Sequence, residues 1–193
     1  MKRVYWALPL ALLLAACKND KPQNGSTIFG NGDGESTELV TEEGETEDLP
    51  AEQPNKGHQY TDLTMPTLQG EMKSLSYYVK QNKVTVIDCW ASWCRPCIEE
   101  MPNIARLYRK YHDLGVGVVG VSFDSDPRAW NTAVKMHDMV WPQLGELNGW
   151  NNQMSHVYGV KGIPHTIIIN RKGEIVAEGL RGEALINAVA KEL

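Results

Sequence analysis

The sequence predicts an α/β fold in which a central mixed β-sheet carries helices on both faces, with a β-hairpin as an N-terminal extension. Residues 84–90 and 116–123 are apolar runs, as is typical of parallel strands that are buried on both sides. A helical pattern follows each run. Residues 165–169 and 174–178 are two further strands joined by the turn Asn170-Arg171-Lys172-Gly173. Alternating strands and helices that end in a hairpin predict a mixed sheet.

The charge distribution separates a tail from one domain. Residues 1–58 hold five Lys/Arg and ten Asp/Glu, whereas residues 59–193 hold fourteen of each, so the net charge of −5 lies in the tail. We therefore expect a single folded domain over residues 59–193. Because this domain is neutral and lacks a basic stripe, nucleic acid is not expected among its partners.

Residues 1–17 have the composition of a targeting segment. Lys2 and Arg3 precede an apolar stretch over residues 6–16, which is too short to span a bilayer. Leu14-Ala15-Ala16-Cys17 resembles the lipobox of bacterial lipoproteins, which implies that Cys17 is acylated and holds the protein on a membrane of the cell envelope, outside the cytoplasm. The alternative is a secretory signal peptide in which Cys17 is incidental.

Residues 18–58 are rich in acidic residues and glycine and poor in apolar ones, so we expect a disordered, solvated tether. A binding role for this acidic segment is the alternative.

Local patterns predict the remaining elements of the domain. Gly70 is placed at the turn of the N-terminal hairpin, and Ser74 is placed as the cap of a short helix over residues 75–80. A long helix runs from Cys94 to about His112, with Pro102 inside it. Three more helices are expected, over residues 128–138 after a cap at 124–127, over 153–158, and over 183–193. The segment that holds Trp141, Pro142 and Trp150 is expected to be a loop.

The sequence Trp93-Cys94-Arg95-Pro96-Cys97 places two thiols three residues apart at the start of the long helix. Free backbone N–H groups and the helix dipole stabilise an anion there, and Arg95 adds a cation. We therefore expect Cys94 to ionise below the usual range of a thiol and to attack disulfides, with Cys97 as the resolving thiol. Cys89 lies in an apolar strand and is expected to be a core residue rather than a third redox group.

Several offsets around this pair carry a family resemblance. Trp93 directly precedes Cys94, Asp88 lies six residues before it, and Glu100 lies three residues after Cys97. Pro164 follows Gly162-Ile163 at the start of a late strand. In these features residues 59–193 resemble thioredoxin-fold thiol–disulfide oxidoreductases of the TlpA-like or ResA-like branch, in a lipoprotein form.

The resemblance implies a redox disulfide between Cys94 and Cys97, with Pro96 influencing its potential. Asp88 is expected to have a raised pKa because it lies in an apolar strand, and it is then the proton acceptor for Cys97; a solvent-exposed strand-edge aspartate is the alternative. Glu100 either tunes the redox pair or faces outward on the helix.

The resemblance also implies a substrate-binding edge. Pro164 is expected to be cis, the backbone of Ile163 pairs with an extended substrate segment, and Trp93 contributes apolar contact surface. His165 departs from the family pattern, in which threonine is typical. It is either a titratable group near the sulfurs or a satisfied structural histidine.

The implied activity is reduction of protein disulfides, in cytochrome c maturation or more generally, with a membrane thiol transporter as electron donor and no cofactor. A disulfide oxidase or isomerase, or a non-enzymatic docking lipoprotein, are the alternatives. A zinc site would need a second ligand pair, which the sequence lacks. A peroxiredoxin would need a threonine and a proline before its reactive cysteine, and both are absent here.

Overall fold

The computed structural model describes residues 53–193, so the predicted leader with Cys17 and most of the predicted tether lie outside the described residues. The domain is built on a five-stranded sheet in the order β5-β4-β3-β6-β7, in which β3 and β4 are parallel and β6 runs antiparallel to β3. The strands are β1 (Thr64–Pro66), β2 (Met72–Ser74), β3 (Val84–Trp90), β4 (Val116–Ser122), β5 (Gln143–Gly145), β6 (His165–Asn170) and β7 (Ile175–Glu178).

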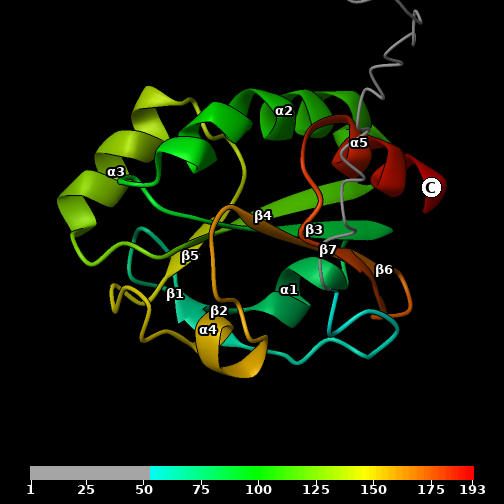
Figure 1. The fold of residues 1–193 in the computed structure, drawn as a ribbon, viewed down its shortest axis with the longest axis horizontal. Coiled ribbons are helices and arrows are strands. Elements are labelled where there is room, and N and C mark those ends of the chain that lie inside the picture. The colour runs from blue at the N-terminus through cyan, green and yellow to red at the C-terminus, as the bar shows by residue number, and fades with distance from the viewer. Residues whose placement is uncertain (1–52) are drawn as a thin grey trace, which may run out of the picture. The chain divides into compact units, whose positions relative to one another are not determined.

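Helices cover both faces of this sheet, as the sequence predicts. The helices are α1 (Leu75–Val79), α2 (Arg95–Tyr111), α3 (Pro127–Met136), α4 (Gln153–Val157), α5 (Gly182–Lys191) and a 3-10 turn over His112–Leu114. Figure 1 shows α2, α3 and α5 on one side of the sheet and α1 and α4 on the other. None of the helices in residues 53–193 is long and apolar enough to cross a membrane.

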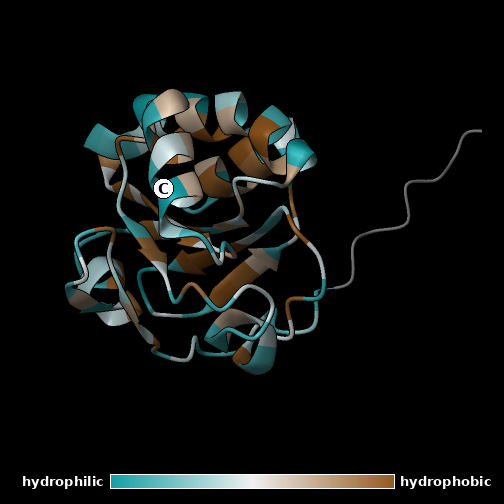
Figure 2. Ribbon diagram, turned by 90° about the vertical axis from the view of Figure 1, so that its left-hand side faces the viewer, coloured by the Kyte–Doolittle hydropathy of each residue, from teal (hydrophilic) through white to brown (hydrophobic). Residues whose placement is uncertain are grey.

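Burial of apolar strands and of one helix stripe positions the sheet under α2. All seven residues of β3 and all seven of β4 are buried, and the most hydrophobic residues gather in these central strands (Figure 2). Met101, Ile104 and Leu107 of α2 are buried against them. Since apolar area removed from water contributes about 25 cal/mol per Å², this packing holds α2 against the sheet.

Local cap and turn residues act as expected. Ser74 caps α1 by accepting the N–H of Tyr77 at 3.2 Å, and Asp126 caps α3 by accepting the N–H of Arg128 at 2.8 Å. Gly70 has a φ of 81° in the turn between β1 and β2, a conformation that favours glycine.

One strand was not predicted. Residues 143–145, expected within a loop, form β5 and pair in parallel with residues 120–122 of β4. The indole of Trp90 donates to Gln143 Oε1 at 3.0 Å. Three residues are too few to show an alternating pattern, and the strand depends on this tertiary contact instead.

The domain also begins earlier than residue 59. The carboxylate of Glu178 accepts the backbone N–H of Asn55 at 2.6 Å and its amide Nδ2 at 3.0 Å. The N–H of Gly57 donates to the carbonyl of Ile175 at 2.7 Å. These long-range contacts are invisible in the composition that placed residues 53–58 in the tether.

Candidate active site

The Cys94–Cys97 disulfide lies at the N-terminus of α2. Cys94 is the N-cap residue, and its Sγ accepts the backbone N–H of Cys97 at 3.2 Å. Pro96 occupies the first turn, where its missing N–H leaves no helical bond unmade. Cys94 is 5% exposed and Cys97 is fully buried. The predicted pairing and placement are confirmed, and the helix terminus offers backbone donors to a Cys94 thiolate.

The side chains beside the disulfide face solvent. Trp93 is 56% exposed and offers an apolar contact surface. Arg95 is also exposed, and its Nε donates to Glu99 Oε1 at 2.9 Å. The cation expected beside the sulfur is thus paired with a carboxylate in solvent, and such pairs exert only weak electrostatic effects.

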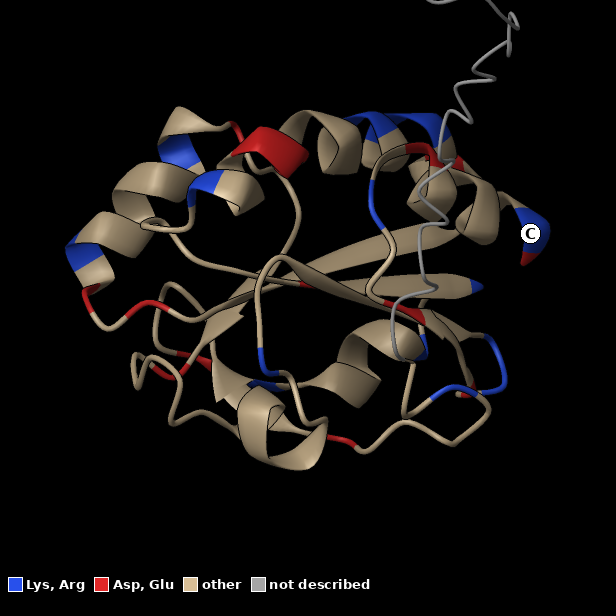
Figure 3. Ribbon diagram, viewed as in Figure 1, with Lys and Arg blue, Asp and Glu red and all other residues tan. Residues whose placement is uncertain are grey.

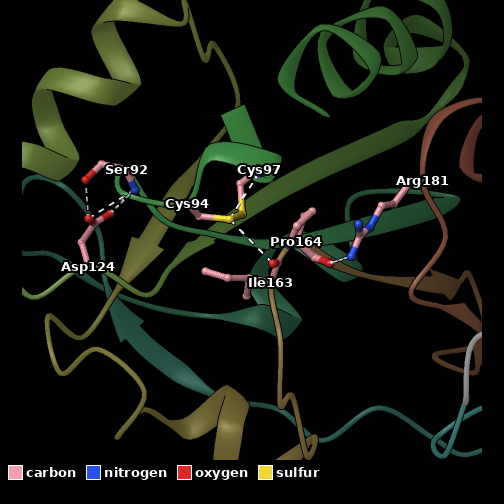
Figure 4. Close-up of a disulfide and its surroundings, with 7 residues drawn as sticks. All are labelled: Ser92, Cys94, Cys97, Asp124, Ile163, Pro164 and Arg181. Atoms are coloured by element: carbon pink, nitrogen blue, oxygen red, sulfur yellow. Dashed lines mark hydrogen bonds between the residues drawn. A yellow bond between two sulfur atoms is a disulfide. The ribbon is translucent and has the colours of Figure 1, made fainter. Parts of the chain in front are cut away.

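A loop before β6 approaches the disulfide from the other side. The Ile163–Pro164 peptide bond is cis, as predicted, and the carbonyl oxygen of Ile163 lies 3.7 Å from Cys94 Sγ (Figure 4). The oxidised sulfur carries no hydrogen, so this is a contact that becomes a hydrogen bond only when the thiol is present. Arg181, which sequence reasoning missed, donates to the carbonyl of Pro164 at 2.9 Å.

Asp88 is a buried acid without a hydrogen-bond partner among residues 53–193. Burial raises the pKa of Asp88 to about 7, and the negative charge of Glu100 adds to that effect. The expected rise is confirmed, and a solvent-exposed aspartate is excluded. Glu100 lies three residues after Cys97 on α2, so the side chains of Glu100 and Cys97 are neighbours on one helix face. The effect of Glu100 on Asp88 places Asp88 close to that face.

Glu100 does not face outward. It is 9% exposed, and its Oε1 accepts the backbone N–H of Gly182 at 2.6 Å while Oε2 accepts Asn103 Nδ2 at 3.0 Å. Gly182 is the first residue of α5, so the carboxylate binds a helix N-terminus, where anions are favoured. Nothing local in the sequence reveals this partner on a distant helix.

His165 lies on the other face of the sheet from Asp88. Its register partner on β3 is Cys89, and successive strand residues point to opposite faces. The His165 Nε2 atom is 3.5 Å from Glu178 Oε2. Burial lowers the pKa of His165, and the adjacent Glu178 carboxylate only partly offsets the effect. The structure therefore places this ring beside Glu178, and its buried Nε2 forms no hydrogen bond within residues 53–193.

Cys89 is confirmed as a core residue. It is a free, fully buried cysteine, and burial raises the pKa of its thiol. Among the described residues, no three His, Cys, Asp or Glu side chains gather as ligands for a metal ion.

Asp124 is a site residue that sequence reasoning assigned only to the cap of a helix. Its buried carboxylate accepts the Ser92 N–H at 3.1 Å and 3.2 Å and the Ser92 hydroxyl at 2.5 Å (Figure 4). It also accepts the Ser122 hydroxyl at 2.8 Å. Ser92 lies two residues before Cys94, so Asp124 fixes the loop that carries the sulfur. The sequence offered one indication of this role, because Asp124 is a polar residue directly after an apolar strand.

Comparison with known proteins agrees with this geometry. The model of the AhpC/TSA family matches residues 56–178. The chain belongs to the AhpC/TSA family. The chain resembles the thioredoxin-like protein YneN of Bacillus subtilis, which is 32% identical over 123 residues that make up 62% of this chain and 68% of that protein. The thiol–disulfide oxidoreductase ResA of Bacillus thuringiensis is 28% identical, over 66% of this chain and 70% of that protein.

Solved structures are similar as well. The thioredoxin domain of a thiol–disulfide oxidoreductase from Bacteroides vulgatus has a TM-score of 0.65 and 29% identity, over 70% of this chain and 96% of that one. A thiol–disulfide oxidoreductase from Bacteroides fragilis has the same TM-score and identity, over 70% and 99%. This AhpC/TSA member thus has the thioredoxin fold and is a thiol–disulfide oxidoreductase of the ResA type, with the Cys94–Cys97 pair.

Proposed function

We propose that this protein is a membrane-anchored, extracytoplasmic reductase of protein disulfides. The Cys94 thiolate attacks one sulfur of the substrate disulfide, whose S–S bond breaks and whose second sulfur leaves as a thiolate. Cys97 then attacks Cys94, which releases the first substrate sulfur and leaves the Cys94–Cys97 disulfide. A membrane thiol transporter returns two electrons and restores the dithiol.

The observation that carries this proposal is the position of Cys94 Sγ. The sulfur lies at a helix N-terminus, where it accepts the N–H of Cys97 at 3.2 Å. It also contacts the carbonyl of Ile163 at 3.7 Å, next to an exposed Trp93. An extended substrate segment that pairs with the backbone of Ile163 would bring its own sulfur to Cys94.

Asp88 and Glu100 serve the resolving step. Cys97 must lose its proton before it attacks, and a base with a pKa near the working pH accepts a proton most effectively. The pKa of Asp88 is raised to about 7 by burial and by Glu100. Asp88 is therefore the proton acceptor for Cys97, and Glu100 helps to raise the pKa of Asp88 to near neutrality.

The cellular setting is part of the proposal. Acylation of Cys17 would hold the chain on the membrane, residues 18–52 would act as its tether, and the substrates would be cytochrome c precursors or other disulfide-containing proteins of the cell envelope. The lipobox-like Leu14-Ala15-Ala16-Cys17 supports this setting. Labelled palmitate should enter the wild-type protein in cells and not the Cys17→Ser variant; equal labelling would reject the anchor.

The direction of electron flow is tested by redox titration and insulin reduction. All proteins carry Cys17→Ser, so that the tail has no thiol. We expect a potential nearer to the value of about −270 mV for thioredoxin than to about −120 mV for DsbA. Insulin reduction should be lost in Cys94→Ser, while Cys97→Ser should trap a mixed disulfide.

The matched control is Cys89→Ala, which removes the one other described cysteine and should keep the activity. A potential above about −180 mV, the value of disulfide isomerase, would reject a reductase and favour an oxidase or isomerase. Insulin reduction that survives in Cys94→Ser would reject the role of the cysteine pair.

A further inference from the structure

A cavity of about 550 Å³ opens beside the loop that approaches the disulfide. Ile163 and Pro164 form one wall. The others come from the end of α4 and the segment that follows it, from the end of β7 and the residues after it, and from Pro54 and Asn55. Asp88, Cys97 and Glu100 are not among the lining residues. The cavity is therefore separate from the buried acids under α2 and lies on the face of the sheet that carries α4.

The cavity is within reach of a substrate bound to Cys94. Ile163 lines it, and the carbonyl of the same residue lies 3.7 Å from Cys94 Sγ. An extended chain advances about 3.3 Å per residue. A polypeptide joined to Cys94 through its cysteine, and running along Ile163, would thus place a side chain in the cavity within about three residues.

The negative charge in the cavity wall already has partners. Glu178 is fully buried, and its carboxylate accepts the N–H and the Nδ2 of Asn55 at 2.6 Å and 3.0 Å. The Nε2 atom of His165 lies 3.5 Å from the same group. These neutral donors hold the Glu178 carboxylate without cancelling its charge, so the cavity wall carries one carboxylate against two cations, Lys161 and Arg181.

The positive charges in the wall do not have such partners. Lys161 and Arg181 line the cavity and are exposed, and the ion pairs formed within residues 53–193 include neither of them. Arg181 uses one nitrogen to donate to Pro164, which leaves most of its five N–H donors free. Charged groups elsewhere are spread over the helices and loops and leave the central sheet almost free of them (Figure 3).

We infer that this cavity binds an acidic side chain of the substrate protein, through Lys161 and Arg181, within about three residues of the attacked cysteine. The inference rests on the proposed function. It adds a preference for disulfides whose cysteine has an Asp or Glu nearby, and it gives Arg181 a second task besides bracing the cis-proline loop.

Synthetic peptides test this preference. Each peptide contains one cysteine in a mixed disulfide with thionitrobenzoate, and a single Glu or Gln is placed in turn at each of the three positions on either side. The reduced full-length protein, with Cys17→Ser, attacks the peptide sulfur, and the thionitrobenzoate thiolate that leaves is measured by its absorbance.

In single-turnover reactions of the reduced protein, we expect at one or more positions a half-saturating concentration of the Glu peptide that is about 3- to 10-fold lower than that of the Gln peptide, with the limiting rate changed less. Raising the salt from about 20 mM to about 500 mM should shrink the difference, because exposed charges are screened. Lys161→Gln and Arg181→Gln should each reduce the preference for the Glu peptide, and the double variant should abolish this preference. Lys161→Glu should reverse it, so that the Gln peptide binds better.

The matched control is Lys172→Gln, which removes a cation from the turn at the far end of β6 and should keep the preference. Arg181→Lys, which keeps the charge, should retain part of it. Equal half-saturating concentrations of the Glu and Gln peptides at every position, or a preference that persists in the double variant, would overturn the inference alone. Absence of thionitrobenzoate release from every peptide would overturn the proposed function as well.

Discussion

The raised pKa of Asp88 makes the stability of the oxidised protein depend on pH. The unfolded chain loses the Asp88 proton near pH 3.8, whereas burial and Glu100 raise the pKa in the folded protein to about 7. Between these values the folded state holds a proton that the unfolded state has lost, so the free energy of unfolding falls as the pH rises. A pKa raised from 3.8 to about 7 corresponds to about 4 kcal/mol in the free energy of unfolding, and the folded protein has lost all of this stability above pH 7.

Asp88→Asn removes this dependence because asparagine does not ionise. Its amide finds no partner because Asp88 has none among residues 53–193, and the unpaired amide costs about 1–3 kcal/mol at every pH. The free energy of unfolding of the variant minus that of wild type should therefore rise by about 4 kcal/mol from acid to alkaline pH. The variant should be the more stable protein above pH 7.

Urea unfolding of the oxidised proteins from acid to alkaline pH measures this difference. The exposed Asp113 provides the matched control, and Asp113→Asn should give a curve nearly parallel to that of wild type. If the curves of wild type and Asp88→Asn were also parallel, Asp88 would titrate alike in both states and the reasoning from burial would be refuted.

Two further substitutions test the neighbours of the redox pair. Glu100→Gln keeps an acceptor for the N–H of Gly182 but removes the charge that acts on Asp88; the pKa of Asp88 should fall, as measured by carboxyl carbon NMR, and an unchanged pKa would contradict the coupling. Asp124→Asn turns an amide toward the donors of Ser92. It should cost about 1–3 kcal/mol in urea unfolding and change the rate at which Cys94 is alkylated; unchanged stability and rate would contradict its role in holding the loop.

The elements that could be predicted are those whose cause is local. The apolar run of β3, the helical stripe of α2 and the capping residue Ser74 are each determined by neighbours within a few positions. The short strand β5 has no such pattern and forms because β4 and Trp90 lie beside it. Sequence periodicity does not contain that information.

The same division holds within the site. The positions of Cys94 and Cys97 follow from the start of one helix. Glu100 is buried because Gly182 of α5 donates to it from 82 residues away. A helical glutamate looks alike in the sequence whether or not a second helix ends against it, so its burial could be learned only from the tertiary structure.

Two adjacent residues on β3 point to opposite faces of the sheet, and each face has different chemical groups. Asp88 points toward α2, where Glu100 acts on it, while Cys89 points to the face that holds His165. Both faces meet at the loop of Ile163 and Pro164, because the carbonyl of Ile163 contacts Cys94 and the other wall of the loop lines the cavity. The proposed proton transfer and the proposed substrate recognition can therefore be tested independently: a substitution at Lys161 should act on the peptide without altering Asp88, and a substitution at Asp88 should do the reverse.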